Sequence, residues 1–438
     1  YRPVSKFLKA NWPSGIYMIR NQMFGNSSEP ISPFAVNRHW VQNRPFTESC
    51  EVIMLELANK GSKKYYGWMT FLLIIVGIGF LLYLRQLDFG LGITGLSRDA
   101  SWGFYIANFT FLVGVAAGGV MVVLPYYLHD YKAFGKVTIL GEFLAIASVL
   151  MCLTFILVDL GQPMRAFNVL LYPTPNSVLF WDAIVLNGYL FLNLVIGWNV
   201  LEAERNGVHY QKWLKPLIYI SIPWAISIHT VTAYLYCGLP GRGFWMTAIL
   251  APRFLSSAFA SGPALLILMC LIIRRVSSFD PGREQIQSLA KIVAYAICVN
   301  VFFFLCEVFV VFYSNIPEHM DHIKYLFVGL HGHGAYVPWM WTSMILMVIG
   351  IILTVNPITR KNEGVLAVAC TVIFLGTWID KGLGMIAGGF TPSPLHEVNE
   401  YIPSLPEIGI ALGVWAMGFL VLTALFKIAV SVKEEVRS

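Results

Sequence analysis

The stretch VTILGEFLAIASVLMCLTFILVD, from Val137 to Asp159, decides the class of fold. It is apolar almost throughout, with Glu142 as its one internal charge and an aspartate as its last residue. A helix of about 20 apolar residues crosses the hydrocarbon core of a bilayer, which is roughly 30 Å thick. Because the run is continuous and does not alternate with a period of two, it predicts a transmembrane helix and not a barrel strand.

The rest of the chain repeats this pattern. Of its 438 residues, 57% are hydrophobic and only 12% are charged, whereas soluble domains carry about 25% charged residues. We therefore predict an all-α, polytopic membrane protein with about ten transmembrane helices. The expected helices cover residues 67–88, 102–128, 137–159, 177–201, 214–236, 254–275, 288–314, 337–356, 364–387 and 406–430.

Lysine and arginine in the short connections predict the orientation, because they favour the cytoplasmic side. The connections on the side of the two termini hold roughly twice as many of these residues as the connections on the other side. We expect a cytoplasmic-membrane protein with both termini in the cytoplasm. Residues 1–66 would form an N-terminal arm, 67–430 the transmembrane domain and 431–438 a tail. The basic arm is expected to contact membrane lipids or a partner subunit, and the net charge of +6 gives no case for nucleic acid.

The cysteines and histidines argue against a bound metal centre in this chain. The seven cysteines stand singly, without a Cys-x-x-Cys pair, so we predict no iron–sulfur cluster. Only His229 lies well inside an expected helix, so we predict no haem held between two histidines. The histidines of EHMDH (318–322) and HGH (331–333) share one outer loop and could meet on a metal. Loop histidines more often hydrogen-bond to backbone, and no metal is predicted.

Polar residues gather at one depth, in the outer half of four consecutive helices. The fifth helix carries His229, Thr232 and Tyr236 at spacing i, i+3, i+7, which is one helix face. Each buried charge costs about 2.5–3.5 kcal/mol on insertion scales, so we expect these side chains to line a functional pocket. A purely structural role for Arg165, which could neutralise one aspartate, would leave the imidazole and the second carboxylate unexplained. The other members of the set are Trp102 and Asn108, Asp159 and Arg165, and Trp181 and Asp182.

The second half of the chain shows the same tendency more weakly. Glu307 lies in the outer half of the seventh helix, and Asp380 with Lys381 near the outer end of the ninth. Adjacent residues point about 100° apart on a helix, so Asp380 and Lys381 each need a partner elsewhere. On the cytoplasmic side Glu142, Asn187 and Asn193 form a thin polar set. This set suits a proton path, which Glu307 and Asp380 could extend in the second half.

Several separated motifs resemble the NrfD/PsrC family, the integral membrane subunits of polysulfide-reductase-type complexes. Within that family they resemble most closely the ten-helix DsrP subunit of the DsrMKJOP complex of sulfate reducers. The resemblance covers roughly residues 67–430. The motifs that carry it include VDLGQPMRAF (158–167), PNSVLFWD (175–182), SIHTVTAYLYCGLPGRGFW (227–245) and WIDKGLGMIAGGF (378–390).

The resemblance implies two four-helix bundles, helices two to five and six to nine, flanked by the first and tenth. It implies a subunit of a menaquinol oxidoreductase that binds no haem and reacts with menaquinone near the outer face. It also implies sulfite- or sulfate-linked electron transport. The implied partners are an extracytoplasmic ferredoxin-like iron–sulfur subunit, a multihaem cytochrome c and a DsrMK-type module with haem b and iron–sulfur clusters.

Quinone chemistry needs an apolar pocket with a hydrogen-bond donor and a proton acceptor for the ring oxygens. We expect His229 to exchange the proton, since the unperturbed pKa of histidine is about 6.5. Asp159 or Asp182 would orient the imidazole or take a second proton. The expected contacts to the ring are Asn108, Trp102, Trp181, Arg165, Tyr236 and Arg253.

Two other classes of protein remain open from the sequence. A secondary transporter or a proton-translocating channel subunit would also bury charges between bundles and break helices at proline or glycine. Gly114 and Gly118, with spacing for close helix packing, fit that interpretation as well. A purely structural anchor is the third possibility.

Overall fold

The computed structural model describes residues 56–129 and 132–437. Most of the expected N-terminal arm, residues 1–55, lies outside the described residues. The described part is helical, and its only β-type pairing is an isolated bridge between Leu330 and His333. Among the described residues, ten helices are long and apolar enough to cross a membrane, which confirms the all-α, ten-helix prediction.

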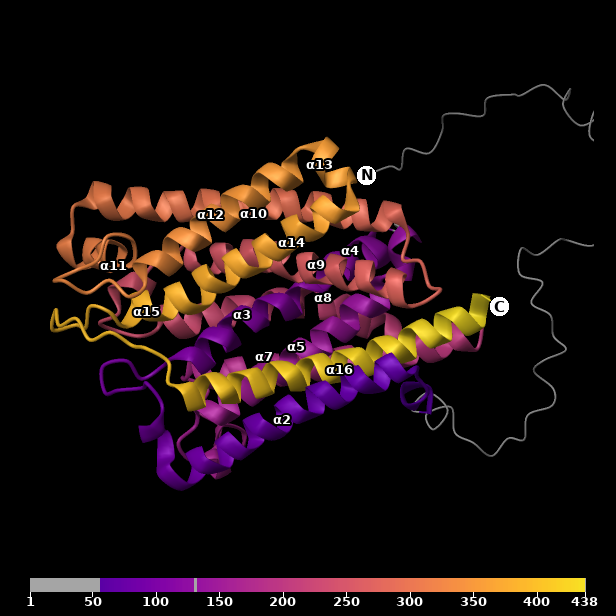
Figure 1. The fold of residues 1–438 in the computed structure, drawn as a ribbon, viewed down its shortest axis with the longest axis horizontal. Helices are drawn as coiled ribbons and strands as arrows, with labels where there is room; N and C mark the ends of the chain where they lie inside the picture. Colours follow the sequence, from indigo (N-terminus) through magenta and orange to yellow (C-terminus); the bar gives the residue numbers. More distant parts are fainter. Residues whose placement is uncertain (1–55, 130–131, 438) are drawn as a thin grey trace, which may run out of the picture. The chain divides into compact units, whose positions relative to one another are not determined.

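Two of the ten spans are interrupted, and each of these two consists of more than one helical element (Figure 1). The second span breaks at Gly119, and the ninth contains a turn of π-helix, Ile379–Gly384. The elements are α2 (Lys63–Phe89), α3 (Phe104–Gly118), α4 (Val120–Leu128), α5 (Thr138–Asp159), α7 (Val178–Arg205), α8 (Leu214–Cys237), α9 (Leu250–Val276), α10 (Arg283–Ser314), α12 (Val337–Val355), α14 (Glu363–Trp378), the π-helical turn, α15 (Met385–Phe390) and α16 (Leu405–Arg437). Short elements in the connections are α6 (Asn168–Leu171), α11 (Pro317–Phe327) and α13 (Pro357–Lys361).

Local sequence signals set several helix ends. The side chain of Ser62 caps α2 by accepting a hydrogen bond from the backbone N–H of Tyr65. Asn362 caps α14 in the same way, accepting from the N–H groups of Gly364 and Val365. The helix α10 stops at Asn315, which adopts the left-handed conformation typical of a helix C-terminus.

The spans form two bundles that share one seam. In the first bundle α3, α5, α7 and α8 pack on one another, and in the second α9, α10, α12 and α14 do so (Figure 1). The helix α2 packs along α16, which also lies against α5. The first bundle meets the second where α3 lies against α9 and the π-helical turn. This is the arrangement of two flanked bundles that the resemblance implied.

Small residues allow the close approach of α3 and α9 at this seam. A Cβ atom on Gly118 would lie 2.6 Å from the Cα of Gly262, which no real side chain tolerates. Close backbone contact of this kind is how transmembrane helices associate without a hydrophobic driving force. Gly118 therefore acts as a packing residue here, and α3 is almost completely buried between its neighbours.

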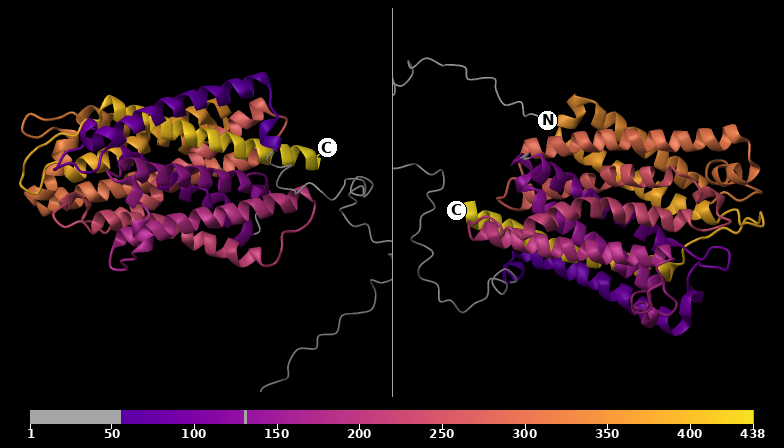
Figure 2. Two further views of the ribbon diagram at one scale, coloured as in Figure 1. Left: turned by 90° about the horizontal axis from the view of Figure 1, so that it is seen from below. Right: turned by 180° about the vertical axis from the view of Figure 1, so that it is seen from behind.

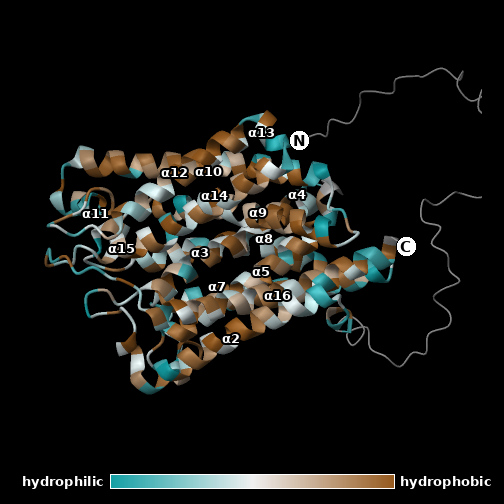
Figure 3. Ribbon diagram, in the orientation of Figure 1, coloured by the Kyte–Doolittle hydropathy of each residue, from teal (hydrophilic) through white to brown (hydrophobic). Residues whose placement is uncertain are grey.

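The outer faces of the bundles suit contact with lipid. In the hydropathy colouring of the ribbon, hydrophobic residues occupy most of the length of the helices, and hydrophilic residues gather mainly at their ends (Figure 3). The helices α2 and α10 expose most of their apolar windows, of which only 11% and 17% are buried. Large exposed side chains such as Phe302 and Phe309 on α10 would be unfavourable in water. The protein is thus a multi-pass integral membrane protein.

The connections lie at two ends, which we call the α11 end and the opposite end (Figures 1 and 2). The α11 end holds α11, α15 and the segment 391–404 that leads into α16. The opposite end holds α13 and the end of α16. Ion pairs join helices there, including Lys433 to Glu204 at 2.6 Å. The sequence predicts that the opposite end is cytoplasmic, and this orientation stays a prediction.

Candidate functional site

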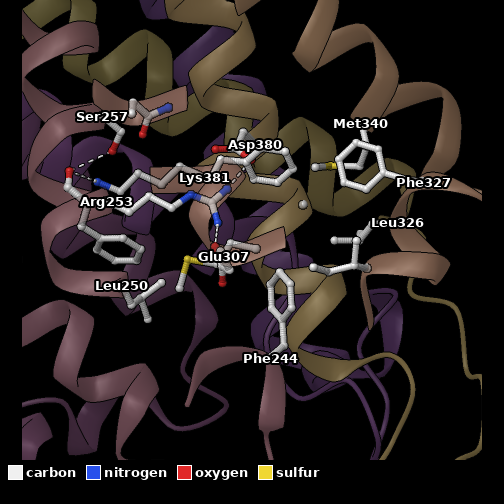
Figure 4. Close-up of a pocket in the computed structure, with 16 residues that line it drawn as sticks. Phe244, Leu250, Arg253, Ser257, Glu307, Leu326, Phe327, Met340, Asp380 and Lys381 are labelled. Carbon is white, nitrogen blue, oxygen red and sulfur yellow. Dashed lines mark hydrogen bonds and ion pairs between the residues drawn. The ribbon is translucent and has the colours of Figure 1, made fainter. Parts of the chain in front are cut away.

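An ion-pair cluster lies inside the second bundle, towards the α11 end. Arg253 of α9 contacts Asp380 of the π-helical turn at 2.7 Å and also forms an ion pair with Glu307 of α10 (Figure 4). All three side chains are buried or nearly so. One guanidinium thus pairs with two carboxylates, and removal of the guanidinium would leave both buried carboxylates without a cation.

The π-helical turn explains how two adjacent residues reach different neighbours. Asp380 points to Arg253, whereas the Nζ atom of Lys381 lies 3.3 Å from Nε2 of His229 and 3.4 Å from the carbonyl oxygen of Phe254. The expectation that each needs a partner elsewhere is confirmed. Nothing in the sequence indicated the π-helix, and such turns occur frequently at functional sites.

A narrow pocket opens beside this cluster (Figure 4). Its polar wall is formed by the ion-pair cluster with Lys381, Ser257 and Asn300. Its enclosed space is about 20 Å³, which is enough for about one water molecule. A ring could enter only if the aromatic side chains moved. The apolar lining is Phe244, Leu250, Phe254, Phe304, Ile323, Leu326, Phe327, Met340, Gly384 and Met385.

His229 stands at the seam between the bundles. The residue is buried, and while Nε2 faces Lys381, its Nδ1 atom has no hydrogen-bond partner. Gly114 of α3 makes room for this contact, because a Cβ there would lie 2.9 Å from Nζ of Lys381 and 3.5 Å from Nε2. Since buried polar atoms are nearly always hydrogen-bonded, the free Nδ1 calls for an explanation.

The two aspartates of the first bundle also lack a cationic partner. Asp182 is buried and its Oδ1 accepts a hydrogen bond of 2.7 Å from Thr232, which lies on the His229 face of α8. Asp159 ends α5, and its buried Oδ1 has no hydrogen-bond partner. Neither carboxylate forms an ion pair within residues 56–129 and 132–437. The structure therefore joins Asp182 to Thr232, three residues after His229 on α8.

Aromatic rings close the first-bundle cluster on the α11 side. Trp102 and Tyr236 meet edge to face with ring centroids 5.5 Å apart, and the hydroxyl of Tyr236 hydrogen-bonds to Thr110. Trp245, which no sequence pattern had indicated, packs on Tyr236 at 5.1 Å. Phe254 contacts both Tyr236 and His229, with centroids 6.0 and 6.2 Å away.

Three expected site residues lie away from this cluster or are already engaged. Arg165 is exposed in its connection and pairs with neither aspartate. Trp181 is 48% exposed and donates to the carbonyl oxygen of Pro175. The side-chain oxygen of Asn108 accepts from the indole N–H groups of Trp378 and Trp415, at 3.0 and 2.9 Å. Asn108 thus braces the first bundle against α14 and α16.

The polar set nearer the opposite end is only partly brought together. Glu142 is fully enclosed in the first bundle and both its oxygens lack a hydrogen-bond partner. The hydroxyl of Tyr127 is also buried without a partner. Asn193 is buried but donates to the carbonyl oxygen of Tyr189 in its own helix. Asn187 is exposed and donates to Ala183, so it does not face Glu142 from the bundle interior.

The loop histidines at the α11 end do not form one site. His322 is buried and its ring hydrogen-bonds to the carbonyl oxygen of Thr391, whereas His333 lies 3.5 Å from Glu400. Burial lowers the pKa of His322 below its usual value, although the Thr391 carbonyl acts in the opposite sense. Across the part of the chain that the structure describes, no group of three or more His, Cys, Asp or Glu side chains could hold a metal ion.

The fold and these buried groups define an α-helical, multi-pass membrane protein with titratable side chains where two bundles meet. The chain belongs to the family described as Polysulphide reductase, NrfD, whose sequence model matches residues 92–392. The resemblance to the NrfD/PsrC family is thereby confirmed.

Relatives of similar length agree with this membership. A protein of Halobacterium salinarum whose name describes the membrane subunit of a dimethyl sulfoxide reductase is 25% identical, over 82% of this chain and 89% of its own. A subunit of the selenate reductase of Mesobacillus selenatarsenatis is 24% identical, over 84% and 93%. The Hdr-like menaquinol oxidoreductase integral membrane subunit of Archaeoglobus fulgidus is 23% identical, over 82% and 92%.

Proposed function

We propose that this protein is the quinone-reactive membrane subunit of a respiratory redox complex. It exchanges electrons between menaquinol or menaquinone and a redox partner outside the membrane. The family membership supports this proposal, and so do relatives named as subunits of a menaquinol oxidoreductase and of selenate and dimethyl sulfoxide reductases. Such a subunit is an enzyme only together with its partners.

One observation carries the proposed site: the buried Nδ1 atom of His229 has no partner, in a cluster whose carboxylates are not neutralised. Arg253, Glu307 and Asp380 satisfy one another, so they need no ligand. His229 keeps a free Nδ1 and Asp182 has only the hydroxyl of Thr232, and the ring of Phe254 packs against His229. An apolar wall with a few converging polar groups is what a quinone ring requires.

The position of each residue suggests its role towards the quinone ring. His229 would hydrogen-bond to one ring oxygen through Nδ1 and take or give a proton there. Asp182, held by Thr232, would hold a second proton, and Asp159 is the further acceptor. Trp102 and Tyr236 would border the ring. The quinone, when bound, supplies a carrier of two electrons and two protons.

The pocket beside Arg253 is a second candidate location for the ring. It is favoured by its aromatic lining and by the polar wall of Glu307, Asp380 and Lys381 (Figure 4). Its small enclosed space and saturated ion pairs weigh against it. The experiment below separates the two locations.

The finer assignment follows the likeness to DsrP. We propose that the α11 end is extracytoplasmic and faces a ferredoxin-like iron–sulfur subunit, with a multihaem cytochrome c and a DsrMK-type module in the complex. The pathway would serve sulfite or sulfate reduction. Reporter fusions after Lys136 and after Asn399 test the orientation. Activity of a cytoplasmic reporter after Asn399 would contradict it.

A proton route towards the opposite end is a further part of the proposal. Glu142 supports it, because a buried carboxyl group without a hydrogen-bond partner destabilises the fold, and such groups in membrane proteins mark functional sites. Tyr127 and Asn193 are the neighbouring polar groups on this route, with Glu307 and Asp380 in the other bundle. Asn187 is left out, since it is exposed. In vesicles, Glu142→Gln should slow quinone-linked proton uptake and leave quinone binding unchanged.

The test of the proposed function compares His229→Leu with Glu307→Gln in the purified complex. Turnover of a menaquinol analogue with the outer redox partner should fall by about 10²-fold or more in His229→Leu, the usual scale for losing a general acid or base. Leucine resembles the imidazole in bulk, so the complex should still assemble. Wild-type turnover in His229→Leu together with loss in Glu307→Gln would move the ring to the second-bundle pocket. Loss in neither variant would contradict both locations.

A further inference from the structure

The contact between His229 and Lys381 joins the two bundles through a pair of titratable groups. We infer that these residues share one proton and relay it from the first-bundle cluster to the ion-pair cluster of the second bundle. This inference rests on the proposed function, because the proton comes from the quinol at His229. Lys381 would act as a positioning and relay residue, without touching the quinol itself.

The structure holds Lys381 in place for this contact from several helices. The side chain leaves the π-helical turn, and Nζ lies 4.4 Å above the ring of Phe254 on α9. It ends 3.3 Å from Nε2 of His229 on α8, in the space that Gly114 on α3 leaves open. Both residues are buried, and Lys381 forms no ion pair with any residue that the structure describes. An ammonium group in this position has the imidazole as its nitrogen acceptor.

The short distance limits the pair to one positive charge, since two cations 3.3 Å apart inside a membrane would repel strongly. When Lys381 carries the proton, its ammonium donates to Nε2, and the imidazole N–H sits on Nδ1 as a donor. When the pair is deprotonated, the Nε2–H donates to the neutral amine, and Nδ1 becomes an acceptor. The charge on Lys381 therefore decides whether Nδ1 donates or accepts.

This alternation gives a balanced transfer. A quinol hydroxyl gives its proton to Nδ1 of the deprotonated pair, and the proton on Nε2 moves to Nζ of Lys381. The O–H bond of the quinol breaks, an N–H bond forms on the ammonium, and no electron passes through the pair. The pair gains one positive charge, which then lies on Lys381 and interacts electrostatically with Asp380 of the second bundle.

Neighbouring charged groups change the proton affinity of the His229–Lys381 pair. Arg253 disfavours a cation on Lys381, whereas Asp380 favours one. Asp182 accepts a hydrogen bond from Thr232, which lies on the same face of α8 as His229. The groups that interact electrostatically with Lys381 are Cys152 of α5, Arg253 of α9 and Asp380 of the π-helical turn. The charged and titratable groups next to these are Asp182 of α7, Tyr236 of α8 and Glu307 of α10.

The test replaces Lys381 by methionine in the purified complex, and Thr377→Val is the matched control. Thr377 lies on the same span, is buried, and bonds only to carbonyl groups of its own helix. In Lys381→Met, binding of a short-chain menaquinone analogue should stay within about threefold of wild type. Turnover of the corresponding menaquinol should fall by about 10²-fold and change its pH dependence, because the ionising unit is no longer the pair. Thr377→Val should behave as wild type.

A second variant keeps both residues and disturbs only their contact. Gly114→Ala places a methyl group 2.9 Å from Nζ and should lower turnover in the same direction as Lys381→Met. Gly77→Ala on α2, where nothing lies within 4 Å, is its control. This variant also decides the question if Lys381→Met fails to assemble.

Two outcomes separate the relay from the proposed function. If His229→Leu is inactive while Lys381→Met and Gly114→Ala keep wild-type turnover and pH dependence, the relay is wrong and the quinone site stands. If His229→Leu is fully active, the proposed site fails, and the relay fails with it.

Discussion

The two bundles bury similar numbers of acidic groups but treat them differently. In the second bundle Glu307 and Asp380 share Arg253, so each charge has a partner. In the first bundle Asp182 accepts only from the hydroxyl of Thr232, one oxygen of Asp159 has no partner, and both oxygens of Glu142 lack one. In a paired cluster the buried charges compensate one another, so no further partner is required. Unpaired acidic groups in a membrane must be protonated, or must gain a partner when a ligand binds. Under the proposed function, the unpaired groups of the first bundle exchange protons with the quinone, and the paired cluster of the second bundle stabilises the structure beside the relay.

The largest expected effect comes from breaking the paired cluster. Arg253→Met should destabilise the second bundle by about 3–5 kcal/mol, because Glu307 and Asp380 would stay buried without a cation. Unfolding in mixed detergent micelles, followed by circular dichroism, measures this loss. The triple variant Arg253→Met, Glu307→Gln, Asp380→Asn should recover part of it. A single variant as stable as wild type would show that the cluster is not structural.

The seam that joins the bundles should be the next most sensitive place. Gly118→Ala inserts a methyl group 2.6 Å from the Cα of Gly262 and should cost about 1–3 kcal/mol, the range for an overpacked core. Gly67→Ala on α2 has open space around it and serves as the control in the same unfolding assay. Equal stability of both variants would mean that α3 and α9 can separate without cost.

A smaller effect is expected at the α11 end, where a buried histidine is held neutral. Burial lowers the pKa of His322 in the folded protein, whereas the unfolded chain takes up a proton near pH 6.5. The unfolded state therefore binds more protons below about pH 6.5, so stability falls as the pH falls through that value, by at most about 1.4 kcal/mol per pH unit. The stability difference between wild type and His322→Gln, measured from pH 8 down to about pH 5, should shrink accordingly. A difference that does not vary with pH would contradict the assignment.

The smallest effect on stability is expected in the first bundle, and it sharpens the comparison. In Asp182→Asn the amide oxygen still accepts from Thr232, so the free energy of unfolding should change by less than about 1 kcal/mol. Turnover of a menaquinol analogue should nevertheless fall by about tenfold or more, because the amide cannot hold the proton. A variant that loses stability but keeps turnover would assign Asp182 to the structure and reverse the contrast between the bundles.

Much of the fold could be predicted without coordinates. The ten spans follow from continuous apolar runs, because burial in hydrocarbon leaves a helix as the only way to satisfy the backbone. The sequence also pointed to His229 and Asp182 on inner faces, from spacing and from the cost of a buried charge. It was less informative for Trp181, Arg165 and Asn187, which lie near helix ends or on exposed faces. Depth along a helix can be counted from a sequence, but the direction of a side chain depends on which neighbour covers it.

The sequence by itself determined the membrane class, the spans and the list of polar groups that had to be explained. Only the tertiary structure decided how these groups pair. The π-helical turn sends Asp380 into the second bundle and Lys381 across to His229. Gly114 leaves the space for that crossing. These contacts join residues more than a hundred positions apart, and a shift of one residue in a helix rotates a side chain by about 100°. Pairing is therefore a property of how the bundles meet, which no single stretch of sequence contains.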